Sequence, residues 1–412
     1  MKFCNKIIRL SVAAALASWS VSGFAGGFAI GTQSGSGTGN AFAGGAAVAD
    51  DASVVWSNPA GMTALPPGKH VTGALHVILP SFKFNNTGST GLLAAPALGN
   101  GGDGGSLAFV PNGFFAMDIT PSLRLGIALN APFGLVTEYD QFWRGQLTAL
   151  KSDLKAININ PAIAYKVNDV FSIGAGVSVQ KIDAELTSGA NAAGTNIFTL
   201  TADDIGYGFN LGATIQPSKA TRIGVQYRSS IKYKLEGTAT FSLAPALNGP
   251  VSADLKTPDT ASISILHQAT PNLEVMGDIT WTKWGNLQQL VIVRGTPLPA
   301  LPSLTFRWDD TLRFGLGANY RLNPQTKLRF GVALDKTPTN DVDRTPRLPD
   351  QDRTWVAFGV QYKPSKQGTL ELAYAHEFVK NGSVNTATAA GTLIGYFKSK
   401  ADIVSLQYSH SF

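Results

Sequence analysis

Strict alternation of apolar residues with small or polar ones constrains this fold more than any other feature of the sequence. From Leu312 to Leu322 every second residue is apolar, and residues 328–335 repeat the pattern. A period of two places the apolar residues on one face of a β-strand. A soluble β-sandwich alternates in the same way, but its strands usually span about 5–6 residues. These stretches run about 9–12 residues, the length that a tilted strand needs to cross a bilayer.

The alternating stretches recur along the chain. They predict fourteen strands, near 69–79, 107–118, 121–131, 156–167, 170–183, 205–217, 220–236, 259–269, 272–286, 305–322, 326–336, 352–363, 368–380 and 398–412. Every second connection is a tight turn such as Asn323-Pro324, and the others are long, such as 131–155. Short turns alternating with long loops, and an even strand number, are typical of a transmembrane barrel. We therefore predict an all-β, 14-stranded antiparallel transmembrane β-barrel with both ends in the periplasm.

The last strand supports an outer-membrane location. One of its faces carries Val404, Leu406, Tyr408, His410 and the terminal Phe412. A terminal phenylalanine after alternating apolar and aromatic residues resembles the signal read by the outer-membrane assembly machinery. We therefore expect that machinery as a partner, and multi-pass insertion into a bacterial outer membrane.

The first 25 residues have the pattern of a secretory signal peptide. Lys2, Lys6 and Arg9 precede a short apolar stretch, and Gly23 and Ala25 place small residues at the cleavage site. A retained membrane anchor is the alternative, but the stretch is shorter than the roughly 20 apolar residues that a span requires. Cleavage after Ala25 would leave 30 basic and 27 acidic side chains, and no cysteine.

Composition argues against several function classes. The near-balanced charge and the lack of a Lys/Arg cluster give no reason to expect nucleic-acid binding. We expect no metal and no cofactor, because the mature chain has no thiol and its histidines have no metal-ligand spacing. No histidine is paired with a nucleophilic serine in a known motif, so we expect no enzyme. The five histidines are scattered over four predicted strands: His70, His76, His267, His376 and His410.

A fourteen-stranded barrel encloses more space than its own side chains fill, because eight strands already hold a small ligand. The lumen is therefore either plugged or an open pore. Residues 26–67 precede the first strand and lack its alternation. A flexible periplasmic tail is one interpretation, and a folded plug is the other. We expect a signal peptide at 1–25, an N-terminal hatch at 26–67 and a barrel at 68–412.

Several motifs resemble the FadL family of outer-membrane transporters for long-chain fatty acids and hydrocarbons. The runs 36–44, 49–52 and 58–60 are similar to the family's N-terminal hatch. Residues 130–139 are similar to the segment that leaves its third strand. Leu348–Arg353 followed by Trp355, and 281–290, also fit. The resemblance covers nearly all the mature chain and implies a 14-stranded barrel with a hatch.

The resemblance implies passive transport by capture in apolar outer loops, transfer to a lumen site and gated lateral release. Hatch residues would be Asn58, Pro59 and Ala60, and a strand break at Pro132 and Gly134 would be the lateral gate. The outer groove would lie in the loops after the third and fourth strands, which favours residues 133–143. Its hydrophobic ligand contacts would be Phe133, Leu135, Val136, Phe142 and Trp143. The alternative interpretation is that these loops only pack on each other.

The substrate remains open between long-chain fatty acids and aromatic or alkane hydrocarbons. A fatty acid carboxylate needs a cationic partner, and Lys181 and Arg307 are the candidates. We further expect contact with outer-membrane lipid and lipopolysaccharide, and a monomer. An open general porin is the rival from another class. It would need a charged constriction and no hatch, which the apolar loops and the long N-terminal segment disfavour.

Overall fold

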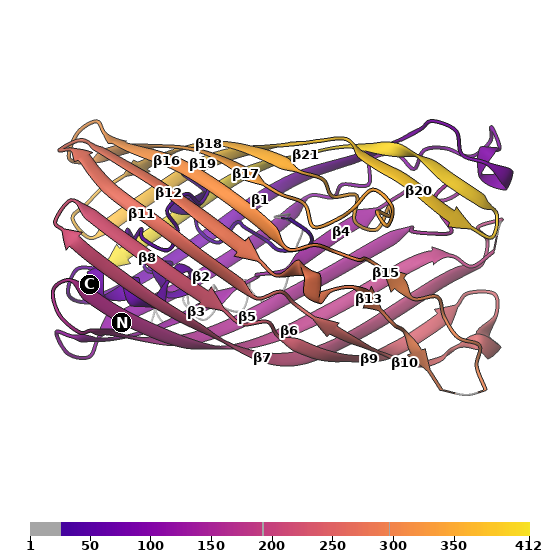
Figure 1. Ribbon diagram of the computed structural model, residues 1–412, viewed down its shortest axis with the longest axis horizontal. Helices are drawn as coiled ribbons and strands as arrows, with labels where there is room; N and C mark the ends of the chain where they lie inside the picture. Colours follow the sequence, from indigo (N-terminus) through magenta and orange to yellow (C-terminus); the bar gives the residue numbers. More distant parts are fainter. Residues whose placement is uncertain (1–25, 192, 296) are drawn as a thin grey trace, which may run out of the picture.

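A computed structural model describes residues 26–412 apart from 192 and 296, and these form a closed 14-stranded antiparallel β-barrel (Figure 1). β1 (Lys69–Asn86) pairs with β2 (Ala108–Asp118) on one side and with β21 (Gly391–Ser411) on the other, which closes the sheet. The predicted fold class is therefore confirmed. The predicted signal peptide lies outside the described residues.

The remaining wall strands follow in chain order, and some are interrupted. The uninterrupted ones are β5 (Lys151–Lys166), β6 (Phe171–Gly189), β7 (Ile197–Ser218), β16 (Thr311–Arg321), β17 (Thr326–Asp335) and β18 (Arg353–Tyr362). The interrupted ones are β3 (Leu123–Asn130) with β4 (Gly134–Glu138), β8 (Thr221–Arg228) with β9 (Lys232–Phe241), β10 (Gly249–Lys256) with β11 (Thr260–Thr270), β12 (Leu273–Thr282) with β14 (Val293–Arg294), and β19 (Gly368–Val379) with β20 (Gly382–Thr388). Outside the wall, β13 (Gln289–Leu290) pairs with β15 (Leu304–Thr305).

Several strands extend further into the loop end of the barrel, at the right of Figure 1, than the sequence predicted. β1 continues to Asn86, β9 and β10 fill much of the predicted loop 237–258, and the predicted loop 381–397 is largely the β20–β21 hairpin. In these parts the buried inner face carries apolar side chains such as Phe82, Phe84 and Phe397, and the outward face carries polar ones. The alternation is therefore inverted relative to the lipid-facing parts of the strands, where the apolar residues point outward.

Two predicted strands are too long. The prediction gave 272–286 and 305–322, but β12 ends at Thr282 and β16 begins at Thr311. A 3₁₀ turn at Trp284–Asn286 follows β12, and the Trp284 side chain is almost fully buried. The chain therefore leaves the wall where an aromatic residue packs inside rather than against lipid.

Residues 26–67, which we call the N-terminal segment, lie inside the barrel. They contain the short helices α2 (Gly35–Gly39) and α3 (Val54–Ser57) and the 3₁₀ helix η1 (Pro59–Ala64), and most of their residues are buried. Within the described part of the chain, no helix combines the length and the apolar character that crossing a membrane requires.

Glycines on the inner face of the wall accommodate the N-terminal segment. A Cβ added at Gly331 would lie 2.0 Å from the carbonyl carbon of Asn40, and one at Gly224 would lie 1.9 Å from the carbonyl oxygen of Ala46. These distances are far below van der Waals contact, so no other residue fits there without displacing the segment. The small residues of the alternating pattern therefore mark where the segment touches the wall.

We expect Gly331→Val to loosen the N-terminal segment while the barrel still assembles. The added side chain overlaps the backbone of Asn40, and such overpacking typically costs about 1–3 kcal/mol. Limited proteolysis of the folded protein should cut residues 26–67 faster. The matched control is Gly113→Val, because Gly113 has no atom within 4 Å of its added Cβ. Equal protection of both variants would contradict this account of the glycines.

Candidate functional site

Large aromatic side chains fill the lumen next to the break between β3 and β4. Phe28 of the N-terminal segment packs on Trp284 with ring centroids 4.9 Å apart and on Phe133 at 5.6 Å. Trp308 lies 5.0 Å from Trp284, edge to face. All four side chains are buried and belong to one apolar cluster that extends into the loops. We call Phe28, Phe133, Trp284 and Trp308 the aromatic cluster.

The wall is interrupted between β3 and β4. Up to Leu129, β3 pairs with β2, but β4 pairs with β5 and, among the described residues, with no part of β2. The N-terminal segment replaces the missing partner. The Ile30 amide donates to the Pro132 carbonyl at 2.8 Å, and the Gly134 amide donates to the Phe28 carbonyl at 2.9 Å. Residues 28–30 therefore act as a short extra strand that closes the break.

Buried amides couple the same break to the N-terminal segment. The Gln33 amide group donates to the Ala131 carbonyl at 3.1 Å, and its oxygen accepts from Asn130. Asn158 of β5 in turn donates to Asn130 at 3.0 Å. Because unpaired buried amides cost free energy, this network stabilises the closed arrangement.

An ionic cluster binds the N-terminal segment to the opposite side of the wall. Arg329 of β17 is almost fully buried and forms two hydrogen bonds with Glu371, at 2.7 and 3.0 Å. Its guanidinium also contacts Asp50 of the segment at 2.9 Å, and Lys327 lies 3.4 Å from the same carboxylate. The segment joins this cluster through Asp50 and through Asn40, whose side-chain oxygen accepts from Arg329 at 3.3 Å.

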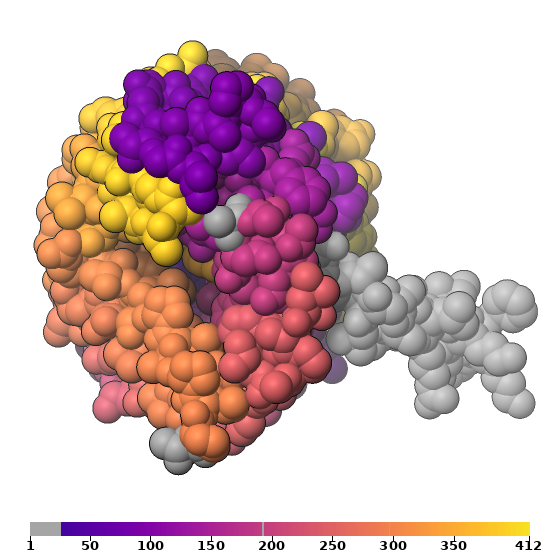
Figure 2. All heavy atoms as spheres, turned by 90° about the vertical axis from the view of Figure 1, so that its right-hand side faces the viewer, coloured from indigo at the N-terminus to yellow at the C-terminus, as the bar shows by residue number. Residues whose placement is uncertain are grey.

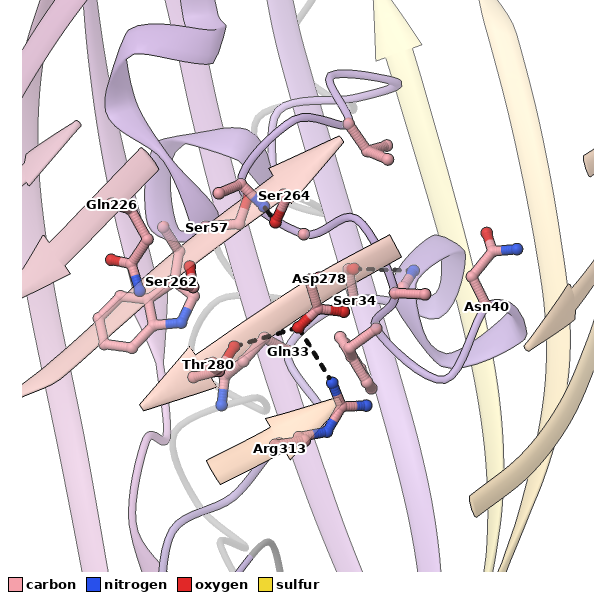
Figure 3. A pocket seen from close by; sticks show the side chains of 18 of the residues that line it. Gln33, Ser34, Asn40, Ser57, Gln226, Ser262, Ser264, Asp278, Thr280 and Arg313 are labelled. Carbon is pink, nitrogen blue, oxygen red and sulfur yellow. Dashed lines mark hydrogen bonds and ion pairs between the residues drawn. The ribbon is translucent and has the colours of Figure 1, made fainter. Parts of the chain in front are cut away.

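A cavity of about 260 Å³ separates the N-terminal segment from strands β8, β11, β12 and β16 (Figure 3). Figure 3 shows hydroxyl, amide and charged side chains pointing into it from both sides. Asp278 lies 3.5 Å from Arg313, and Gln226, Ser262 and Thr280 line the same space. The cavity is therefore predominantly polar where it borders these wall strands.

A larger pocket of about 880 Å³ lies among the loops at the other end of the lumen. Figure 2 looks onto this end, which is hollowed between the magenta, orange and yellow segments. Eleven large apolar side chains line the pocket, besides four alanines: Leu92, Leu147, Leu186, Phe198, Phe241, Ile292, Leu301, Pro302, Leu304, Phe306 and Val342. Its charged side chains are Asp343 and Arg347. We call this space the outer pocket. Its lining suits an elongated apolar molecule.

A family model described as outer membrane protein transport protein (OMPP1/FadL/TodX) matches residues 14–412. The chain belongs to this family. Outer membrane protein P1 of Haemophilus influenzae is 29% identical over 395 residues and is covered to 85%, as is this chain. A long-chain fatty acid transport protein of Escherichia coli is 27% identical, with 89% of this chain and 90% of that protein covered.

Solved structures of the FadL family have the same fold. A FadL homologue of Pseudomonas aeruginosa superposes with a TM-score of 0.86 at 25% identity, over 94% of this chain and 100% of that one. The toluene transporter TbuX of Ralstonia pickettii superposes with a TM-score of 0.70 at 20% identity, over 95% and 99% of the two chains. This FadL-family barrel is thus a transport protein of the bacterial outer membrane and not an enzyme.

The predicted hatch residues lie where the N-terminal segment meets β6 and β7. The Asn58 amide is fully buried and donates to the Ala46 carbonyl at 2.7 Å and to the Ala213 carbonyl at 3.1 Å. Pro59 begins η1, and Ala60 donates its amide to the Asn58 side chain. Asn58 therefore joins two parts of the segment to the wall.

The predicted gate residues lie at the observed break between β3 and β4. Pro132 lies within it and Gly134 is the first residue of β4. Their backbones make the two hydrogen bonds to residues 28–30 described above.

The predicted apolar groove residues do not line the outer pocket. Phe133, Leu135, Val136 and Trp143 are buried, and among the five only Phe142 is exposed. Trp143 stacks on Tyr139 with centroids 4.5 Å apart and donates to the Ala149 carbonyl at 2.9 Å. For aromatic side chains in a loop, packing against each other is more favourable in free energy than exposure to water. These four side chains thus pack within the protein in this structure, and their contact with a ligand stays a prediction.

The two cationic candidates also lie away from the outer pocket lining. Lys181 is on the outward face of β6, between Asp183 at 2.7 Å and Asp203 at 3.5 Å. Arg307 is exposed and its Nε donates to Asp343 at 2.7 Å. Each cation already has a carboxylate partner. Sequence reasoning missed Arg347, because nothing in the sequence shows which of the loop arginines lacks such a partner.

We expect Asn58→Ala to release part of the N-terminal segment. The variant leaves the Ala46 and Ala213 carbonyls without their donor, and each unsatisfied buried group costs about 1–3 kcal/mol. Hydrogen exchange should quicken in residues 44–64 and stay unchanged in β16–β18. Asn381→Ala is the control, since Asn381 is exposed. Unchanged exchange in Asn58→Ala would show that Asn58 does not hold the segment.

Proposed function

We propose that this FadL-family barrel carries long-chain fatty acids passively across the outer membrane. Transport of hydrophobic compounds across that membrane is the function that the family supports. The observation that carries the finer proposal is the outer pocket, an apolar space above a lumen that the N-terminal segment fills. In this proposal residues 1–25 are a signal peptide, 26–67 a hatch and 68–412 a monomeric barrel.

The free energy of capture comes from apolar surface. Each buried CH₂ contributes about 0.8 kcal/mol, so a dozen methylenes give roughly 10 kcal/mol before the entropy losses of binding. Binding is therefore easily strong enough, and release is the harder step. Release requires a second state with lower affinity for the ligand. Movement of the N-terminal segment, which contributes Phe28 to the aromatic cluster, would create that state.

The polar wall side of the 260 Å³ cavity favours sideways release. An alkyl chain that moved on toward the periplasm would displace water from Gln226, Ser262 and Asp278 without replacing its hydrogen bonds, which is costly. The break at 131–133 offers a route to lipid beside the aromatic cluster. We propose that residues 28–30 withdraw from Pro132 and Gly134, so that the ligand leaves between β2 and β4.

Neutral hydrocarbons are the second candidate substrate. The outer pocket is lined mainly by apolar side chains, and TbuX, a toluene transporter, shares the fold.

The decisive experiment deletes the gene and compares uptake of labelled oleate and of toluene. We expect oleate uptake to fall and to return when the gene is restored. Loss of toluene uptake alone would favour the hydrocarbon, and unchanged uptake of both would refute both candidates.

A reversible cross-link tests the gate. Ala29 and Phe133 are bridge partners flanked by the two hydrogen bonds, a geometry in which side chains approach closely. We expect the double variant Ala29→Cys/Phe133→Cys to lose oleate uptake when oxidised and to regain it with a reductant. Each single variant is a control for the substitution itself. Full uptake by the cross-linked protein would exclude release through this break.

An open porin would behave differently in planar bilayers. Because the N-terminal segment fills the lumen, we expect no steady large conductance from the purified protein. Such a conductance would contradict the transporter proposal. The conclusion that the chain folds as a β-barrel does not depend on this result.

A further inference from the structure

We propose that Arg347 binds the anionic headgroup of the substrate in the outer pocket, and that this residue makes the barrel prefer a long-chain carboxylate to a neutral molecule of the same chain. The inference rests on the proposed function, because it concerns the same pocket. It names the substrate class as an elongated amphiphile with one terminal anion.

Arg347 lines the outer pocket but has no carboxylate partner among the described residues. One of its terminal nitrogens donates to the Lys151 carbonyl and to the Ser152 hydroxyl, both at 3.2 Å. Its Nε is buried and has no acceptor. A guanidinium has five N–H donors, so several of them remain available to a ligand.

The charge of Arg347 is retained in this setting. Burial lowers the pKa of Arg347 to about 10, which leaves the guanidinium protonated at neutral pH. A partly buried cation without a counter-ion is unfavourable. An anion that entered the pocket would therefore gain a strong, charge-assisted hydrogen bond, which a guanidinium often forms with both carboxylate oxygens.

Neighbouring charges do not compete for that role. Asp343, the other charged residue of the pocket, is held by Arg307 with an Nε–Oδ2 distance of 2.7 Å. Lys151 lies 2.9 Å from Glu185. Arg347 is thus the cation of the outer pocket that is left for a ligand, within the part of the chain that the structure describes.

The position of Arg347 is fixed by the loop that carries it. The Thr137 hydroxyl donates to the Arg347 carbonyl at 3.1 Å, and the Tyr139 hydroxyl donates to the Pro346 carbonyl at 2.8 Å. Leu348 on the other side is buried in the apolar cluster. The guanidinium therefore starts from an anchored backbone, at the border between polar atoms of β5 and the apolar lining formed by residues such as Leu147 and Phe306.

The test compares equilibrium binding of oleate and oleyl alcohol to the full-length purified protein in a non-ionic detergent. We expect Arg347→Gln to weaken oleate binding about 10- to 100-fold, the usual range for a hydrogen bond to a charged group. Binding of oleyl alcohol should change less than about twofold, because its apolar contacts remain. Arg347→Lys should retain part of the oleate affinity, because it keeps a point charge but not the planar fork.

Arg321→Gln is the matched control. Arg321 is exposed at the turn end of β16, opposite the outer pocket, and should leave both affinities unchanged. The heat-dependent gel mobility of each variant shows whether its barrel has folded. If Arg347→Gln fails to fold, Arg347→Lys alone decides the test. An unchanged preference for oleate over oleyl alcohol in Arg347→Lys would refute a bidentate contact between the Arg347 guanidinium and the carboxylate.

Three results would overturn the proposal. The first is unchanged oleate binding in Arg347→Gln, and the second is an equal loss of oleate and oleyl alcohol binding, which would make Arg347 a purely structural residue. The third is a larger oleate-specific loss in Arg307→Gln. Failure of the wild-type protein to bind either probe would instead refute the proposed function. Binding of both probes without preference would refute only the role of Arg347.

Discussion

Every backbone amide and carbonyl of a chain in lipid must find a partner within the protein, and this requirement shapes the whole structure. Pairing of neighbouring strands satisfies this requirement for most of the wall, and pairing of β1 with β21 closes the barrel. The requirement is not met where β4 departs from β2, and there Phe28 and Ile30 supply the missing bonds. The N-terminal segment consequently completes the wall of the barrel and also fills its lumen.

This double role links the segment to the wall at separate points. Gln33 connects it to the break, Asn58 to β7 and Asp50 to the ionic cluster around Arg329. A displacement that frees the break must also strain or break contacts elsewhere in the lumen. Two discrete arrangements are easier to reconcile with such a network than a gradual motion, because packed interiors resist continuous deformation.

The sequence predicted those parts of the fold that lipid dictates. Alternation at 312–322 and 328–335 located strands because one face must be apolar in a membrane. The same logic failed for β20 and the first part of β21, where apolar residues such as Val384 and Phe397 face inward rather than toward lipid. It also failed at Trp284, which is buried by tertiary packing that no local pattern records.

The candidate site was less predictable than the wall. Pro132 and Gly134 were placed correctly at a break, because proline and glycine signal one locally and the family resemblance pointed there. Trp143 was predicted to contact the ligand, and in the structure it is buried and stacks on Tyr139. Arg347 could not be distinguished from Arg307 by sequence, because the difference between them is the presence of Asp343 beside only one.

The glycines of the inner wall have a consequence for the cell that carries this protein. Their bare backbone lies directly against the segment, so a foreign or shortened segment would lose this close contact at Gly224 and Gly331. The close fit of the segment thus leaves small solutes little room to pass through a barrel that transports hydrophobic compounds across the outer membrane.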